Sequence, residues 1–162
     1  MKMLIVAGSG GHSVQALILH KQLGKAYQIS FMLDRKDKVT QKKLSKFKQY
    51  HAIEIRGKKE NVISTLFRII ACSIESLSIL FRSRPEVIVS TGPGFAIPIT
   101  FFGKIFGKKI IFIESWSRVN TRSYAGKIIY NYADMFFVQW PELLKKYPKA
   151  RYNGRFDAKG FK

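Results

Sequence analysis

A histidine beside a glycine cluster is the part of this sequence whose residue types could do chemistry. Apolar residues 3–6 precede the cluster and a helical pattern at residues 14–23 follows it; the cluster reads Gly8-Ser9-Gly10-Gly11-His12-Ser13. Glycines allow a tight turn close to a ligand, and the N–H groups that begin a helix attract anions. The spacing fits neither the dinucleotide fingerprint nor the ATP-binding P-loop. Phosphate binding is therefore one reading, and an ordinary first turn with a hydrogen-bonded histidine is the other.

Two further polar segments follow predicted strands. A glycine loop comes directly after the strand at 87–89, and a polar and aromatic loop comes after the strand at 110–113: Thr91-Gly92-Pro93-Gly94 and Glu114-Ser115-Trp116-Ser117-Arg118. In the strand order 3-2-1-4-5-6, the carboxyl ends of strands one, four and five lie side by side. We therefore expect one crevice, with Glu114 as its only carboxylate.

The role of Glu114 has two readings. It could accept a hydrogen bond or a proton from a sugar hydroxyl, or it could be a capping carboxylate paired with Arg118. Trp116 could stack on a sugar or belong to the core. Neither the residue types nor their spacing decide between these alternatives.

Alternating strands and helices predict one α/β domain with a mostly parallel, Rossmann-like, doubly wound sheet. We expect strands at 3–7, 28–33, 52–55, 87–89, 110–113 and 135–139. Helices are expected at about 11–23, 61–81, 95–106, 124–132 and 141–146, with a solvated, Lys-rich helix at 34–50. In residues 61–81, the apolar stripe is expected to face the sheet, with some apolar surface left over. Residues 1–147 form the predicted domain, and residues 148–162 a tail without regular pattern.

The composition restricts the class of protein. The net charge of +19, from 29 basic and 10 acidic residues, favours polyanionic partners such as nucleic acid, anionic lipid or a phosphorylated substrate. A single cysteine, Cys72, excludes an internal disulfide and a cysteine-based zinc site, and no metal site is expected. No stretch of about 20 residues lacks charge, so no transmembrane helix is predicted. Lys104, Lys108 and Lys109 adjoin the apolar helix at 95–106 and suit anionic lipid headgroups.

The motifs resemble those of one family in order and in type. The glycine–histidine segment, the Gly-Pro-Gly loop and the segment around Glu114 are followed by Val138-Gln139-Trp140-Pro141-Glu142. Together they are similar to the acceptor-side, membrane-recruiting subunit of the split UDP-N-acetylglucosamine transferase of dolichol-linked glycan assembly, and to its bacterial capsule and exopolysaccharide relatives. The resemblance covers about residues 1–155.

The resemblance implies a two-subunit enzyme. This chain would be the N-terminal half of a GT-B glycosyltransferase, similar to the enzyme that adds N-acetylglucosamine to lipid-linked muramyl peptide. A small partner would hold the UDP-sugar donor, so this chain would carry no cofactor and would be inactive alone. It would form a heterodimer and act on a polyprenyl-diphosphate-linked sugar. Eukaryotic members carry an N-terminal anchor and this chain begins at the strand, so peripheral attachment to the cytoplasmic face of an anionic membrane is expected.

The resemblance also implies roles for individual residues. His12 and Glu114 would be catalytic, and Ser115, Trp116 and Arg118 would contact the acceptor sugar or the partner. The acceptor diphosphate would bind at Gly8, Ser9, Gly10, Gly11, Ser13, Thr91, Gly92, Pro93 and Gly94. Separately from the resemblance, the lack of regular pattern in residues 141–162 suggests a strap that orders on the partner. Truncation after Lys146 is then expected to weaken association while leaving the domain folded. The alternatives are a basic module without chemistry, binding RNA or an acidic partner, and a membrane adaptor that only activates its partner; no nucleic acid is expected under the first reading.

Overall fold

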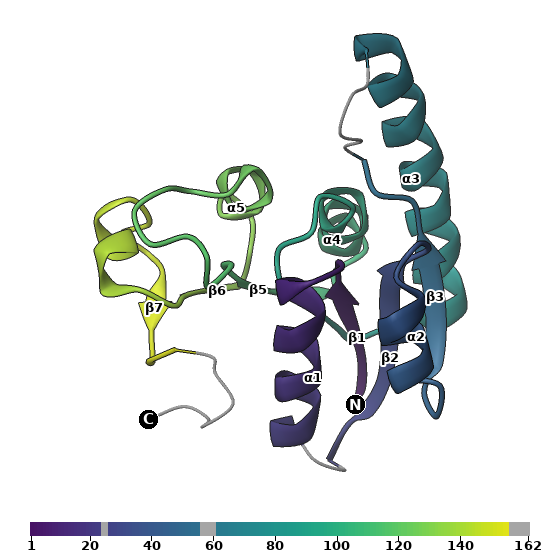
Figure 1. The fold of residues 1–162 in the computed structure, drawn as a ribbon, viewed down its shortest axis with the longest axis horizontal. Helices are drawn as coiled ribbons and strands as arrows, with labels where there is room; N and C mark the ends of the chain where they lie inside the picture. Colours follow the sequence, from purple (N-terminus) through teal and green to yellow (C-terminus); the bar gives the residue numbers. More distant parts are fainter. Residues whose placement is uncertain (24–25, 56–60, 156–162) are drawn as a thin grey trace.

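A seven-stranded parallel sheet organises the chain. The structure is a computed structural model and describes residues 1–23, 26–55 and 61–155. The strand order is β3-β2-β1-β4-β5-β6-β7 (Figure 1). The strands are β1 (Lys2–Ala7), β2 (Gln28–Asp34), β3 (Lys48–Ala52), β4 (Val87–Ser90), β5 (Lys109–Ile113), β6 (Met135–Val138) and β7 (Arg151–Tyr152). The predicted α/β class and the reversal of strand order between β1 and β4 are both confirmed.

Helices cover both faces of the sheet. They are α1 (Gly11–Leu23), α2 (Lys38–Lys43), α3 (Val62–Ser83), α4 (Ala96–Ile105), α5 (Tyr124–Ile129) and the 3₁₀ helix η2 (Pro141–Lys145). Alternate residues of a strand enter opposite cores. In β1, Leu4 and Val6 pack in the core that α3, α4 and α5 cover, whereas Met3, Ile5 and Ala7 pack in the core that α1 covers. Side chains on the α3–α5 face therefore lie on the other side of the sheet from α1.

The third strand begins earlier than the sequence predicts. Residues 48–52 pair with β2, so the helix expected at 34–50 is only the short helix α2. The Asp37 side chain caps the amino end of α2 by accepting a hydrogen bond from the Thr40 N–H. Of the β3 side chains, only Tyr50 and Ala52 are buried, because β3 is the edge strand and the rest of it faces water. A polar edge strand of this kind has the same composition as a solvated helix, which explains the wrong prediction.

Helix α3 does not turn its apolar stripe toward the sheet. Its buried residues are Cys72, Ser76, Ile79 and Leu80, whereas the predicted core stripe is largely exposed: Ile63, Leu66, Phe67, Ile70 and Ile74. The 22-residue helix is about 33 Å long and the five-residue strand β3 about 17 Å. The amino-terminal half of α3 therefore projects past the sheet (Figure 1). By length and composition alone α3 is apolar enough to cross a membrane, and the prediction of no transmembrane helix stays a prediction.

The end of the described chain joins the sheet. Arg151–Tyr152 pairs with β6, although residues 148–162 were expected to have no regular pattern. Tyr147, just before this strand, is fully buried. Residues 156–162 lie outside the described residues, so the partner-binding strap stays a prediction.

Candidate functional site

The loops after β1 and β4 pack directly against each other, as the strand order predicts. A methyl group on Gly8 would lie 2.8 Å from Cβ of Pro93, so the two loops touch only because residue 8 has no side chain. The Thr91 N–H donates to the Val6 carbonyl at 3.1 Å, and the Thr91 hydroxyl donates to the His12 carbonyl at 3.1 Å. These bonds hold the start of α1 over the β4–α4 loop.

His12 has a defined orientation in this junction. Its Nδ1 lies 2.5 Å from the Thr91 carbonyl oxygen. A carbonyl only accepts hydrogen bonds, so Nδ1 carries the hydrogen and Nε2 of the neutral ring keeps its lone pair. The ring packs over Gly92, where a Cβ would lie 3.2 Å from Cε1 of His12 and where φ is +102°, a conformation that glycine favours.

Burial keeps the His12 imidazole neutral. Desolvation lowers the pKa of His12 below its usual 6.5, and the nearby positive charge of Arg118 adds to this effect. The hydrogen bond to Thr91 and the negative charge of Glu114 oppose it. At neutral pH the ring is therefore uncharged, and its Nε2 can accept a proton.

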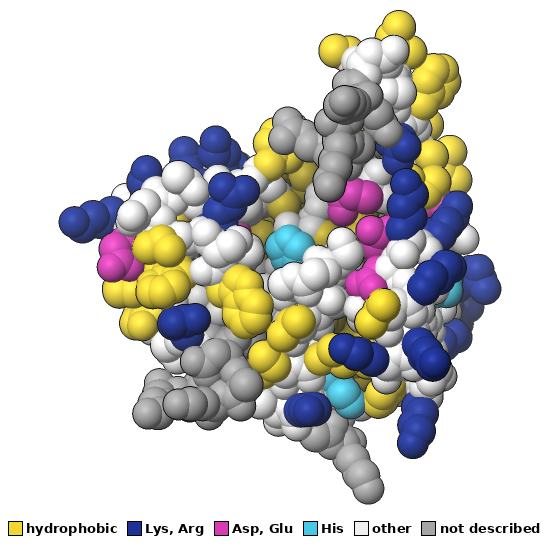
Figure 2. All heavy atoms as spheres, in the orientation of Figure 1, with side chains coloured by type: hydrophobic (Ala, Val, Ile, Leu, Met, Phe, Trp, Pro, Cys, Tyr) yellow, Lys and Arg dark blue, Asp and Glu magenta, His cyan; other side chains and the backbone are white. Residues whose placement is uncertain are grey.

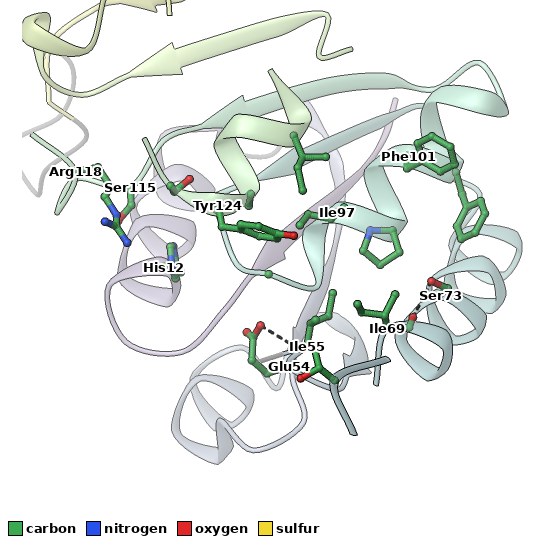
Figure 3. Close-up of a pocket in the computed structure, with 18 of the residues that line it drawn as sticks. His12, Glu54, Ile55, Ile69, Ser73, Ile97, Phe101, Ser115, Arg118 and Tyr124 are labelled. Atoms are coloured by element: carbon green, nitrogen blue, oxygen red, sulfur yellow. Dashed lines mark hydrogen bonds between the residues drawn. The ribbon is translucent and has the colours of Figure 1, made fainter. Parts of the chain in front are cut away.

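A pocket of about 580 Å³ begins at His12 and continues between α3, α4 and α5. Figure 3 shows His12, Ser115 and Arg118 at one side of it and Phe101 at the other. It is lined by His12, Glu54, Ile55, Thr65, Ile69, Ser73, Gly92, Gly94, Ile97, Pro98, Phe101, Phe102, Ser115, Ser117, Arg118, Ser123, Tyr124, Ala125 and Ile128. Within the part of the chain that the structure describes, no three His, Cys, Asp or Glu side chains are grouped as metal ligands.

The predicted diphosphate residues divide into two groups. Gly92 and Gly94 line the pocket. The hydroxyl groups of Ser13 and Thr91 instead donate to backbone carbonyls of the two loops, Ser13 to Gly10 at 2.7 Å. Gly8 and Pro93 are buried against each other, while Ser9 and Gly10 are exposed in the turn, where Gly10 has φ +68°. These residues build the turn, and their predicted contact with a diphosphate stays a prediction.

The predicted sugar-contacting residues also divide. Ser115 and Arg118 line the pocket, and the backbone N–H of Arg118 donates to the Ser115 carbonyl at 3.0 Å. Trp116 lies over the start of α1: a methyl group on Gly11 would come within 2.9 Å of its Nε1. The Trp116 carbonyl accepts from Nε1 of Trp140 at 2.6 Å. Trp116 thus joins two loops and does not line the pocket.

Glu114 is fully buried and does not line the pocket. Its carboxylate accepts from the Ser115 N–H at 2.9 Å, the Ser123 N–H and hydroxyl at 3.2 and 3.0 Å, and the Tyr147 hydroxyl at 2.8 Å. Burial and the Glu114 charge raise the pKa of Tyr147, so that its hydroxyl stays protonated and donates. In this geometry Glu114 holds the pocket-lining Ser115 and Ser123 in place, and its predicted catalytic role stays a prediction.

Replacing Glu114 should destabilise the fold, contrary to the expectation from the sequence that Glu114→Ala is tolerated. The change leaves the Ser123 and Tyr147 donors without their acceptor, and each buried unsatisfied donor costs about 1–3 kcal/mol. We expect Glu114→Ala to lower the free energy of unfolding by about 2–4 kcal/mol in urea titrations. Glu142→Ala, at an exposed position of η2, is the control. Unchanged stability with lost activity would instead support direct catalysis.

Glu54 is a pocket residue that the sequence analysis missed. It lines the pocket beside the β4–α4 loop, where a methyl group on Gly94 would lie 2.5 Å from Oε1 of Glu54 (Figure 3). The expectation that Glu114 is the only carboxylate near the crevice is therefore wrong. Placing the third strand at 52–55 put Glu54 inside a strand, whereas it follows β3 at the carboxyl edge of the sheet. A predicted strand ending at Ala52 would have placed Glu54 in the loop beside the pocket.

Comparisons with known proteins match almost the whole chain. The family described as "Oligosaccharide biosynthesis protein Alg14 like" matches residues 3–156. The human protein named UDP-N-acetylglucosamine transferase subunit ALG14 is 33% identical over 178 residues, covering 96% of this chain and 82% of that protein. The subunit of the same name from Schizosaccharomyces pombe is 33% identical over 171 residues, covering 94% and 81%.

Solved structures show the same fold in longer chains. MurG of Acinetobacter baumannii superposes with a TM-score of 0.70 at 17% identity, covering 95% of this chain and 43% of MurG. UDP-GlcNAc 2-epimerase from Methanocaldococcus jannaschii superposes with a TM-score of 0.64 at 14% identity, covering 96% and 46%. The chain thus spans less than half the length of these two structures.

Proposed function

Because the chain belongs to the Alg14-like family of oligosaccharide biosynthesis proteins, we propose that it is the acceptor-binding subunit of a two-subunit UDP-N-acetylglucosamine transferase. Its acceptor is a polyprenyl-diphosphate-linked sugar, and a separate donor-binding subunit holds the UDP-sugar. The observation that carries the proposal is the position of His12, whose neutral ring lies at the junction of two glycine loops and lines the pocket.

His12 acts as the general base. A hydroxyl of the acceptor sugar attacks the anomeric carbon of the donor sugar, and its proton passes to Nε2 of His12. The new glycosidic bond forms while the bond from the anomeric carbon to the UDP oxygen breaks, and UDP leaves with the electron pair. Nδ1 stays bound to the Thr91 carbonyl, which fixes the ring during the transfer.

Charges and backbone dipoles hold the acceptor diphosphate. Arg118 contributes a cation to the wall of the pocket, and the first turn of α1, where His12 lies, contributes the positive end of the helix dipole. The Glu54 carboxylate would repel a diphosphate and therefore suits the hydroxyl groups of the acceptor sugar. The pocket thus offers one end for phosphate and one carboxylate for sugar.

A transfer assay tests the division of labour between subunits. The purified chain, mixed with UDP-N-acetylglucosamine and a polyprenyl-diphosphate-linked N-acetylglucosamine, should give no product. Addition of the donor-binding subunit should start the reaction, because the described residues form one sheet and include no second domain for the donor. Product formation by this chain alone would refute the two-subunit proposal.

The apolar face that α3 and α4 leave exposed suits a membrane. Phe67, Ile70 and Ile74 on α3 are at least half exposed, as are Phe101 and Ile105 on α4. The ring centroids of Phe81 and Phe106 lie 5.3 Å apart, and this contact joins the two helices into one surface, here called the α3–α4 apolar surface. Figure 2 shows hydrophobic side chains along the projecting end of α3 and basic side chains on both flanks of the molecule. This is the arrangement of a peripheral, anionic-lipid-binding protein, and we place it on the cytoplasmic side.

The predicted lysine cluster contributes unequally to this contact. Lys104 forms an ion pair with Asp134 at 2.6 Å, so much of its charge is already balanced. Lys108 and Lys109 follow Phe106 by two and three residues, and the charge of Lys109 also acts on Asp134. We therefore expect Lys108 to contribute more than Lys104 to lipid binding.

Vesicle binding should depend on both charge and apolar contact. The protein should sediment with vesicles containing anionic lipid, and added salt should weaken the binding through screening. Phe67→Glu should lower the affinity by at least about tenfold, because burying a phenylalanine contributes about 1.5–3 kcal/mol. Val39→Glu, at an exposed position on α2, is the matched control. Equal binding of both variants would show that the α3–α4 apolar surface is not the contact.

A further inference from the structure

The pocket changes in chemical character along its length. Its polar end holds His12, Gly92, Ser115 and Arg118. The other end, here called the apolar arm, is lined mainly by Ile55, Ile69, Ile97, Phe101, Phe102 and Ile128, with Thr65 and Ser73 of α3 also in its lining. Figure 3 shows the two ends on opposite sides, with Tyr124 and Ile97 between them. One cavity therefore joins a site for an anionic, hydrogen-bonding group to a site for hydrocarbon.

The apolar arm also opens onto the α3–α4 apolar surface. Phe101 of α4 lines the arm and is 50% exposed, so it belongs both to the cavity and to the face that we assign to the membrane. Ile69 of α3 also lines the arm, on a different side of the helix from Phe67 and Ile74. A hydrocarbon chain can leave the arm past Phe101 onto that face.

These features define the ligand that fits. It has a phosphate and sugar at one end and a hydrocarbon chain at the other. A sugar nucleotide does not match, because its second end is a polar base and ribose. A cavity of about 580 Å³ holds a ligand of drug-like size and is too small for a whole polyprenyl chain. Only the part of the chain next to the diphosphate can lie inside.

We infer that the first isoprene units of the acceptor lipid bind in the apolar arm, with the remainder of the chain leaving over the α3–α4 apolar surface. This inference rests on the proposed function, because it takes the diphosphate to lie at the polar end. It adds that the subunit recognises the lipid as well as the sugar. Affinity for the acceptor then depends on residues that never approach the transferred sugar.

Direct binding of two soluble probes tests the inference. One probe is N-acetylglucosamine diphosphate linked to farnesol, used below its micelle concentration, and the other is its methyl ester without the isoprene chain. Calorimetry with the full chain, without membranes, should show the farnesyl probe binding at least about tenfold more tightly, because the arm removes its hydrocarbon from water.

Variants locate the farnesyl contact. Ile97→Ser makes the arm more polar, whereas Ser73→Leu fills the arm with apolar atoms. If both variants bind the farnesyl probe more weakly, a change in polarity alone cannot explain the loss. In each of these two variants, the affinity for the farnesyl probe should fall close to the affinity for the methyl probe. The affinity for the methyl probe itself should not change. Phe67→Ser, on the exposed face of α3 and outside the pocket lining, is the control and should keep the difference.

The outcomes separate the inference from the proposed function. Equal affinity for the two probes would overturn the isoprene site and leave the headgroup site standing. Farnesyl binding that only Phe67→Ser weakens would place the chain on the outer surface and would also overturn it. Failure of both probes to bind would reject the proposed function together with the inference.

Discussion

Replacing His12 with asparagine should reduce the rate of sugar transfer by about 10²–10⁴-fold, the usual cost of losing a general base. Asparagine can still donate a hydrogen bond to the Thr91 carbonyl, so the loop junction should remain folded. The measurement is the transfer rate with the donor-binding subunit present. His51→Asn, at an exposed position on β3, should transfer at the normal rate. Normal transfer by His12→Asn would remove His12 from the reaction.

The pH dependence gives a second readout of the same residue. Burial lowers the pKa of His12, so kcat/KM should rise with pH through a pKa below 6.5 and then level off. The protonated ring at low pH cannot accept the hydroxyl proton. The inflection should disappear in His12→Asn; an unchanged profile in that variant would assign the titration to another group.

The same lowered pKa affects stability. In the unfolded chain His12 would titrate near its usual 6.5, so the unfolded state binds the proton first as the pH falls. His12 therefore favours the folded state above that pH, and this contribution decreases from about pH 6.5 downward, through the lower pKa of the folded protein. Comparing unfolding of the wild type and His12→Asn at pH 7.5 and pH 5.5 would detect the difference.

The part of the site that the sequence predicts is the part that topology controls. In a parallel sheet with reversed strand order, loops after neighbouring strands must meet. This is why His12, Gly92 and Arg118, which are far apart in the chain, could be expected at one place. The contact between Gly8 and Pro93 follows from the same rule.

The part that the sequence misses depends on which way a side chain points. Glu114 and Glu54 both follow strands, yet Glu114 turns inward to Ser123 and Tyr147 while Glu54 lines the pocket. Glu114 comes directly after β5 and Glu54 two residues after β3, and neither spacing says which way the side chain turns. Tyr147 lies 33 positions after Glu114 and belongs to no clear pattern, which hides this donor from sequence analysis.

Helix α3 illustrates a second limit. Its apolar stripe is correctly found, but periodicity does not say whether a stripe faces a core or a lipid surface. The small residues Cys72 and Ser76, which look incidental in the sequence, form the face that packs on the sheet. The exposed stripe is the α3 part of the proposed membrane contact, and Phe101 of α4 joins that contact to the pocket.

Truncation after Lys146 should prevent stable folding, contrary to the expectation that the domain ends near residue 147 with a dispensable tail. Tyr147 is fully buried, and the centroid of its ring lies 4.9 Å from that of Tyr130 and 4.6 Å from that of Phe136. Removing a buried aromatic side chain costs about 3–5 kcal/mol. The truncation also removes the hydrogen bond to Glu114 and the strand β7. The sum is comparable with the total stability of a domain, about 5–15 kcal/mol.

Truncation after Arg155 separates folding from partner binding. It keeps Tyr147 and β7, so thermal unfolding should match that of the full chain, and any loss of association with the donor-binding subunit then reports on residues 156–162 alone.

Tyr147→Phe, which keeps the ring and loses the hydroxyl, should lie between the two truncations in stability, because Glu114 loses one of its donors while the core stays filled. If the chain ending at Lys146 unfolded cooperatively at the temperature of the full chain, Tyr147 would not support the Glu114 loop, and the tail would be dispensable after all. The order of the three variants in thermal stability thus decides whether the C-terminal segment belongs to the site or only to the interface.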